Sequence, residues 1–258
     1  NNFNEYILQK EKIITSNKFG YNIVCVDDKN TKNIFHRHKK KIIPISSNYI
    51  EKGIYFENNK IIDNYFNEKK DLEINEISSS LFGSFNIENI LASYVVCRIL
   101  NINFKNFVHI IKNFKGLPHR LEKIYENNKL QIINNSKATN VASSLKSVIS
   151  YNNINLILGG RAKEKNFKSF IHYKSNINKI YLIGEASDTI FKQISQNIEC
   201  ELCTTLESAI KQIFLDLKNK RKFQTILFSP ACSSFDQFIN FEQRGDLFKK
   251  IINKVLDV

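Results

Sequence analysis

The sequence predicts an α/β protein whose second half forms a doubly wound, mostly parallel sheet. Strand and helix patterns alternate there, and "INLILGG", "KIYLIG" and "QTILFSP" are continuous apolar runs. Such runs are typical of strands that are covered on both faces. The rhythm of the pattern changes at "FKGLPHR" (114–120), where Gly116 and Pro118 interrupt it. We therefore expect two domains, 1–115 and 116–258.

The first half mixes helices with short strands. "FNEYILQKEKIITS" has helical spacing, and the adjacent Asn58 and Asn59 predict a hairpin turn. Glu88 lies where a helix N-terminus favours an acidic side chain. The expected helices are 3–16, 83–100 and 104–113, and the expected strands are 21–28, 41–45, the hairpin 53–63 and 71–75.

The second half repeats strand and helix in order. Strands are expected at 121–126, 130–134, 154–158, 179–183, 198–203 and 224–229, and helices at 140–150, 166–173, 186–195, 205–219 and 241–256. Proteins of this class bind ligands at the carboxyl ends of their parallel strands. The polar residues that follow each strand are therefore the first place to look for a site.

Composition excludes some classes of function. The chain has 258 residues and a net charge of +13, but its lysines are scattered among acidic residues. The one basic cluster, "HRHKKK" (36–41), is expected in a surface loop, so we expect no nucleic-acid partner, although a basic nucleic-acid-binding protein remains an alternative. No run is long and apolar enough to predict membrane insertion.

Cysteine and methionine usage adds two expectations. The five cysteines are an odd number and lie mostly in apolar runs, which favours a reducing cytoplasmic setting. "CELC" (200–203) has no second ligand pair to complete a zinc site. Methionine is absent, even at position 1. We therefore expect a fragment of a longer protein.

Three of the predicted strands end in unusual polar stretches, "NNSKATN" (134–140), "LGGRAK" (158–163) and "SPACSSFDQFINFEQRG" (229–245). A helix N-terminus beside Lys137 suits an anion, and paired glycines let a ligand approach the backbone. Each stretch also has an ordinary structural interpretation, as a helix cap, a turn or core aromatics. Together they indicate a pocket for an anionic small molecule.

With "GLPHR", these stretches resemble the ordered motifs of the Mur ligase family, and most closely those of its D-glutamate-adding members. The resemblance covers nearly the whole chain. It implies that residues 1–115 are the second half of a central α/β ATPase domain and that 116–258 are a Rossmann-like C-terminal domain. The uridine-binding domain and the phosphate loop would then precede residue 1.

The resemblance also implies an activity. ATP and Mg²⁺ would convert the carboxylate of UDP-N-acetylmuramoyl-L-alanine into an acyl phosphate, and the amine of D-glutamate would attack it in peptidoglycan synthesis. We expect the chain alone to be inactive, cytoplasmic and monomeric. The alternative is a non-catalytic nucleotide- or amino-acid-binding paralogue.

The family's roles can be assigned residue by residue. The resemblance implies that Lys10, as a carbamate, holds magnesium and that Lys10 and Lys137 are catalytic. It implies contact with ATP for Asn86, Asn89, His119, Arg120, Asn135 and Lys137, and with D-glutamate for Thr139, Lys163, Ser234, Phe235 and Phe241. Asn135 replaces the family's usual aspartate and Phe85 its usual histidine. Both departures slightly favour the non-catalytic alternative, whereas the retained Lys10, Lys137, Thr139 and Lys163 oppose it.

Overall fold

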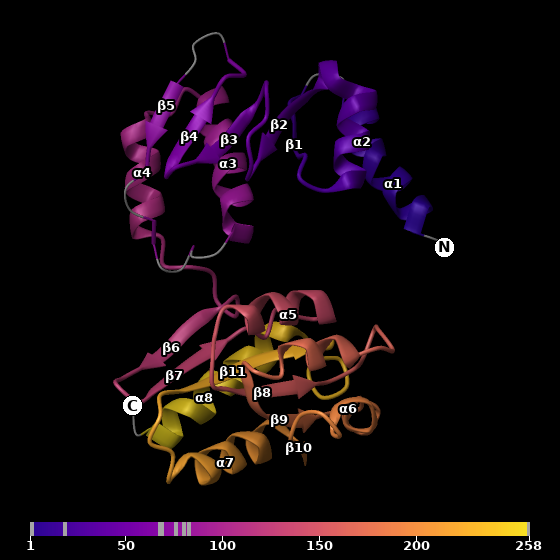
Figure 1. Cartoon of the computed structure of the whole chain (residues 1–258), viewed down its shortest axis with the longest axis vertical. Coiled ribbons are helices and arrows are strands. Elements are labelled where there is room, and N and C mark those ends of the chain that lie inside the picture. The colour runs from indigo at the N-terminus through magenta and orange to yellow at the C-terminus, as the bar shows by residue number, and fades with distance from the viewer. Residues whose placement is uncertain are drawn as a thin grey trace. The chain divides into compact units, whose positions relative to one another are not determined.

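The computed structural model describes residues 3–17, 20–66, 70–74, 77–78, 81 and 84–256, without the side chains of Ser84 and Phe85. The chain divides into two compact units, Asn1–Lys115 and Gly116–Val258, each described by itself (Figure 1). Which Mur ligase domain each unit corresponds to stays a prediction. No helix among these residues is both long and apolar enough to cross a membrane.

The first unit contains a five-stranded mixed sheet in the order β1-β2-β3-β4-β5. Its strands are β1 (Asn22–Cys25), β2 (Ile42–Ser46), β3 (Ile54–Glu57), β4 (Lys60–Asp63) and β5 (Lys70–Glu73). β1 to β3 pair in parallel, and the rest pair antiparallel. The predicted hairpin is confirmed: Asn58 and Asn59 have φ of 51° and 58°, which suits a tight turn between two strands.

Helices cover this sheet on both faces. α3 (Ser84–Ile99) and α4 (Phe104–Asn113) share a core with Ile43 and Ile45. α1 (Phe3–Ser16) and α2 (Lys29–His38) pack instead around Ile42. Successive strand residues point to opposite faces, so β2 supplies apolar contacts to both layers.

The basic cluster 36–41 is not a loop, and that expectation was wrong. It forms the last turn of α2 and a 3₁₀ helix, η1 (Lys39–Lys41). Asp28 caps α2 by accepting bonds from the N–H groups of Asn30 and Thr31. Arg37 and His38 then reach the buried Glu11, with the His38 Nε2 at 2.7 Å from Oε1. The cluster therefore contributes to folding of this unit.

The second unit is doubly wound, as predicted. Its six-stranded sheet has the order β10-β9-β8-β11-β7-β6. The strands are β6 (Glu122–Glu126), β7 (Leu130–Asn134), β8 (Ile154–Gly159), β9 (Ile177–Ile183), β10 (Cys200–Thr204) and β11 (Gln224–Ala231). Only β6 is antiparallel to its neighbour. α5 (Val141–Ile149), η3 (Lys168–Tyr173) and α6 (Ser187–Ile194) cover one face, and α7 (Leu206–Leu217) and α8 (Phe241–Leu256) cover the other.

The segment expected as an α-helix at 166–173 is a 3₁₀ helix, η3. Phe167 and Phe170 are both fully buried. Their spacing of three residues matches the period of a 3₁₀ turn, which eclipses side chains i and i+3. Packing of these two rings therefore favours the tighter helix.

The strand order places the three polar stretches beside one another. β11 lies between β8 and β7, and all three strands run parallel. Their carboxyl ends therefore meet at one edge of the sheet, where ligand sites of doubly wound proteins lie.

Candidate functional site

A cavity of about 510 Å³ opens at this edge of the second unit. It is lined by Leu117, Pro118, His119, Arg120, Lys137, Phe241, Glu242, Asp246 and Lys249. Three of these side chains are cationic and two are carboxylates. A pocket with an excess of positive charge and an aromatic wall suits an anionic ligand with an apolar part.

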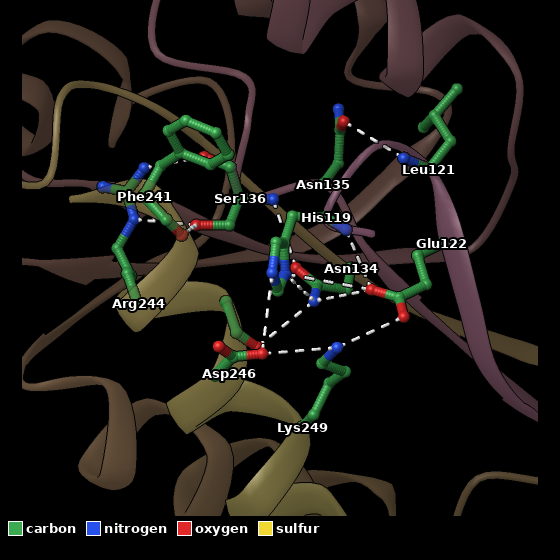
Figure 2. Close-up of polar contacts among 11 residues, drawn as sticks. His119, Leu121, Glu122, Asn134, Asn135, Ser136, Phe241, Arg244, Asp246 and Lys249 are labelled. Carbon is green, nitrogen blue, oxygen red and sulfur yellow. Dashed lines mark hydrogen bonds and ion pairs between the residues drawn. The ribbon is translucent and has the colours of Figure 1, made fainter. Parts of the chain in front are cut away.

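His119 anchors one wall of the cavity. Its φ is 61°, and its ring is almost fully buried. Asn134 Nδ2 donates to Nδ1 at 3.0 Å, so the ring proton is assigned to Nε2, which lies 3.6 Å from Asp246 Oδ1 (Figure 2). The main-chain carbonyl of His119 accepts the N–H of Lys137 at 3.0 Å. The residue therefore ties the wall of the cavity to the strand end that carries Lys137.

Asn135 is buried and both ends of its amide are engaged. Oδ1 accepts the N–H of Leu121 at 3.2 Å, and Nδ2 donates to Ser229 Oγ at 3.1 Å. The amide thus links the end of β7 to the start of β6 and to β11. Its predicted contact with the ribose of ATP stays a prediction, and such a contact competes with these two bonds.

Ser136, within the polar stretch 134–140, is fully buried. Its Oγ donates to the carbonyl of Phe241 at 2.8 Å and accepts from Arg244 Nε at 3.1 Å. Arg244 Nη2 donates to the carbonyls of Ser136 and Cys232 at 2.9 and 3.1 Å. Sequence reasoning gave Arg244 no role. Its spacing from the buried Phe248 and Ile252, four and eight residues on, was a signal that it faces the core.

Lys137 is exposed beside this anchored turn. Its Nζ lies 4.0 Å from the centroid of the Phe241 ring. The ring face attracts the ammonium group and limits where the flexible lysine can reach. Of the predicted site residues, His119, Arg120, Lys137 and Phe241 line this one cavity.

Comparison with known proteins relates the chain to ligases. No protein-family model matches the chain. It is 35% identical over 260 residues to the UDP-N-acetylmuramoylalanine–D-glutamate ligase of Rickettsia bellii, a match that spans 98% of this chain and 57% of the relative. The same ligase of the Wolbachia from Brugia malayi is 34% identical, across 98% of this chain and 50% of the relative. The chain is thus a homologue of these Mur ligases along nearly its whole length.

Solved structures show the same fold. A Mur ligase of Thermotoga maritima, UDP-N-acetylmuramate–alanine ligase, matches 99% of this chain and 56% of its own with a TM-score of 0.62 and 12% identity. A pseudomurein peptide ligase of Methanothermus fervidus matches 98% and 60%, with a TM-score of 0.64 and 19% identity. The chain spans about half the length of the curated Mur ligases that it matches.

The residues that Mur ligases would use for D-glutamate lie at the neighbouring strand ends. Thr139, Lys163, Ser234 and Phe235 are outside the lining of the cavity, and Phe241 is part of it. Ser234 is buried, whereas 59% of Phe235 is exposed. Main-chain bonds of 2.9 and 3.0 Å between Arg161 and Ser233 join the segments that carry Lys163 and Ser234. The D-glutamate role of these residues stays a prediction.

The predicted Mur ligase residues of the first unit do not form a described site. Lys10 is exposed on α1, with Nζ 5.5 Å from the Tyr6 ring centroid. Asn89 Nδ2 donates to Asn86 Oδ1 at 3.2 Å in the first turns of α3. The side chain of Phe85 lies outside the described residues. Their roles stay predictions.

Sequence reasoning missed one cluster in this unit. Ligand atoms of Cys25, Asp27 and Glu88 lie within 4.8 Å of one another. Burial raises the pKa of the Cys25 thiol to about 12. Exposed acidic groups often lie this close together without a metal ion, and we assign no metal centre here.

Proposed function

We propose that this chain forms part of an ATP-dependent amide ligase that adds D-glutamate to UDP-N-acetylmuramoyl-L-alanine. The observation that carries the proposal is the convergence of Arg120, Lys137 and Lys249 on one cavity at the strand ends. Lys249 is paired with Glu122 and Asp246 at 3.3 and 3.4 Å, so Arg120 and Lys137 are the cations that we propose offset the charge of the phosphates of ATP. The names of the relatives supply the substrates.

The residues fit the chemistry of an acyl phosphate. The γ-phosphoryl group passes to a carboxylate oxygen of the UDP-linked substrate, and ADP leaves. The amine of D-glutamate then attacks the carbonyl carbon, the C–O bond to phosphate breaks, and the amine loses a proton. Positive charge near the phosphates lowers the barrier because anions meet in the transition state. Lys137, held against Phe241, is the residue that we place at the phosphates.

D-glutamate carries two carboxylates and needs its own donors. We assign the α-carboxylate to Lys163 and Thr139, and the side-chain carboxylate to Ser234, Phe235 and Phe241. The bridge between Arg161 and Ser233 supports this assignment because it holds two of these segments side by side. Arg161 itself is engaged by Glu185 at 2.7 Å, which leaves Lys163 as the cation for the ligand.

Magnesium is less well supported than ATP. The resemblance gives Lys10, as a carbamate, the role of holding Mg²⁺, and Lys10 is exposed. Its described contact is with the Tyr6 ring, whose centroid lies 5.5 Å from Nζ. We therefore keep this role as a proposal and derive no step from it. We also propose that the protein is monomeric and cytoplasmic.

The second candidate is a paralogue that binds nucleotide or amino acid without catalysis. The engagement of Asn135 with Leu121 and Ser229 favours it, since this amide is occupied where the family usually has a ribose-binding aspartate. Both candidates would bind ATP through the same charged residues. Catalytic turnover is what distinguishes the ligase from the paralogue.

The test is phosphate release from ATP by the complete gene product, with and without D-glutamate, in the presence of UDP-N-acetylmuramoyl-L-alanine. We expect release to depend on D-glutamate and the 258-residue chain alone to show none. Lys137→Met should abolish it, whereas the exposed Lys129→Met should not. Equal release with and without D-glutamate would contradict the ligase, and ATP binding without turnover would support the paralogue.

A further inference from the structure

Arg244 is a buried arginine at the centre of the three strand ends. Only 1% of it is exposed, although it lies on α8 close to the cavity. The guanidinium donates three bonds, to Ser136 Oγ, Ser136 O and Cys232 O (Figure 2 shows those to Ser136). These acceptors belong to the segments that follow β7 and end β11. One side chain therefore joins two neighbouring strand ends.

The third strand end, after β8, carries a glycine next to the Arg244 guanidinium. Gly160 follows β8 with φ +126°, and a Cβ there would lie 2.5 Å from the carbonyl oxygen of Ser233 and 3.1 Å from Arg244 Nη1. Nη1 is buried and has no hydrogen-bond partner in the part of the chain that the structure describes. Within the described residues, it is the buried side-chain polar atom that is left unpaired. A side chain larger than hydrogen at 160 would push against the guanidinium. The glycine thus serves the arginine as well as its own backbone conformation.

Burial of this charge is costly. It lowers the pKa of Arg244 to about 10, although the carboxylate of Asp236 opposes the shift. An apolar residue of similar size would avoid the desolvation penalty. What an apolar residue would lose is the set of three directed bonds, which only a planar fork supplies.

We propose that Arg244 is a positioning residue for Lys137. It fixes Ser136, the residue before Lys137, through both the carbonyl and the hydroxyl. The same hydroxyl bonds the carbonyl of Phe241, whose ring lies under the Lys137 ammonium. Arg244 and Phe241 therefore set the start and the end of the Lys137 side chain. The inference rests on the proposed role of Lys137 at the phosphates of ATP.

The test measures ATP binding to the 258-residue chain by NMR, following the main-chain amide of Lys137. Arg244→Lys keeps the charge but loses the fork, and should weaken binding by about fivefold. Lys137→Met should weaken it at least as much. Adding Arg244→Lys to Lys137→Met should then cost nothing further, because the arginine acts through the lysine. Arg221→Lys, at an exposed site, is the matched control and should bind like the wild type.

Each other outcome overturns a specific claim. If Lys137→Met binds ATP like the wild type, the proposed role of Lys137 at the phosphates fails. If the 258-residue wild type does not bind ATP, the same variants are compared in the complete gene product, and absence of binding there overturns the proposed function. If Lys137→Met weakens binding but Arg244→Lys does not, or if the two effects add, only the positioning role fails. Should Arg244→Lys not fold, Ser136→Ala removes the hydroxyl alone and should weaken binding about twofold, with the same non-additivity. A lower melting temperature with unchanged affinity would show a purely structural role.

Discussion

The ammonium nitrogen of Lys137 lies 4.0 Å from the centroid of the Phe241 ring. The two residues come from the end of β7 and the start of α8, on neighbouring walls of the same cavity. The ring attracts the cation without neutralising it. The contact therefore restricts the position of Lys137 without pairing it with a carboxylate.

Replacing Phe241 with leucine should weaken binding of ATP to the chain. A cation–π contact at an exposed site contributes about 0.5–1 kcal/mol, which corresponds to a two- to fivefold change in affinity. Calorimetric titration with ATP measures it. Phe223→Leu removes an exposed ring elsewhere and serves as the control. An unchanged affinity in Phe241→Leu would show that the ring does not hold Lys137 for the ligand.

Asn135→Asp tests the departure from the family at the end of β7. An aspartate can still accept the N–H of Leu121 and a bond from the Ser229 hydroxyl, so we expect the fold to survive. It adds a charged acceptor for ribose hydroxyls. The KM for ATP of the complete gene product should therefore fall. A KM that does not change would mean that residue 135 acts only within the fold.

The order of elements in the second unit could be predicted because buried parallel strands read as apolar runs. The adjacency of β8, β11 and β7 could not, since it depends on where each crossover returns to the sheet. The helix α2 was not predicted because it is mostly polar and basic. Its helical signals are limited to one buried residue, Ile34, and the cap at Asp28. Its packing depends on Glu11, distant in sequence.

In the site, the residue types were easier to predict than their orientations. Lys137 and Phe241 do line one cavity. Asn135 and Ser136 both lie in the stretch 134–140 that was expected at a ligand site, yet their side-chain polar atoms bond within the protein. No local pattern distinguishes a hydroxyl that faces a ligand from one that faces a buried arginine.

Asp63→Ala should destabilise the first unit. The carboxylate is fully buried and accepts bonds from Tyr94 Oη at 2.8 Å and Arg98 Nε at 3.2 Å. Its removal leaves a phenol and a cation unpaired, with an expected cost of about 3 kcal/mol. Hydrogen exchange of the β4 amides measures this unit separately. Asp71→Ala, on the neighbouring strand but exposed, should change protection little, and equal effects would argue against the buried network.

Glu11 should make the same unit sensitive to acid. A hydrogen bond from Arg37, opposed by burial and assisted by His38, lowers the pKa of this carboxyl from 4.5 to about 2. Because the folded pKa is the lower one, the stabilisation is full above pH 4.5 and is lost as pH falls towards 2. Arg37 is half exposed, so we expect only about 1–2 kcal/mol.

The measurement is urea unfolding followed by the Ile14 methyl signal, which reports on the core between α1 and α2. Glu11→Gln should lower the urea midpoint at pH 7 and leave it close to the wild type at pH 2. If the urea midpoints of wild type and variant differed equally at pH 7 and pH 2, the effect would come from packing and not from the charge of Glu11.

Gly245→Ala tests the packing of His119 on α8, because the sign of the change in stability depends on that packing. Alanine within a helix normally stabilises by about 1 kcal/mol relative to glycine. Here the added Cβ would lie 2.2 Å from His119 Nδ1, so the imidazole or α8 must move. Overpacking of this kind costs about 1–3 kcal/mol, and we expect a net loss of stability. The bond from Asn134 to Nδ1 should be lost with it.

A double-mutant cycle identifies the cause. His119→Gly removes the ring and suits the backbone φ of 61°. In that background Gly245→Ala meets no imidazole, so its effect on the melting temperature should become neutral or stabilising. If alanine at 245 destabilises equally with and without the ring, the glycine is required by another neighbour of α8. If alanine stabilises even beside His119, the close packing of the ring on α8 is wrong, and with it the anchor that joins the cavity wall to Lys137.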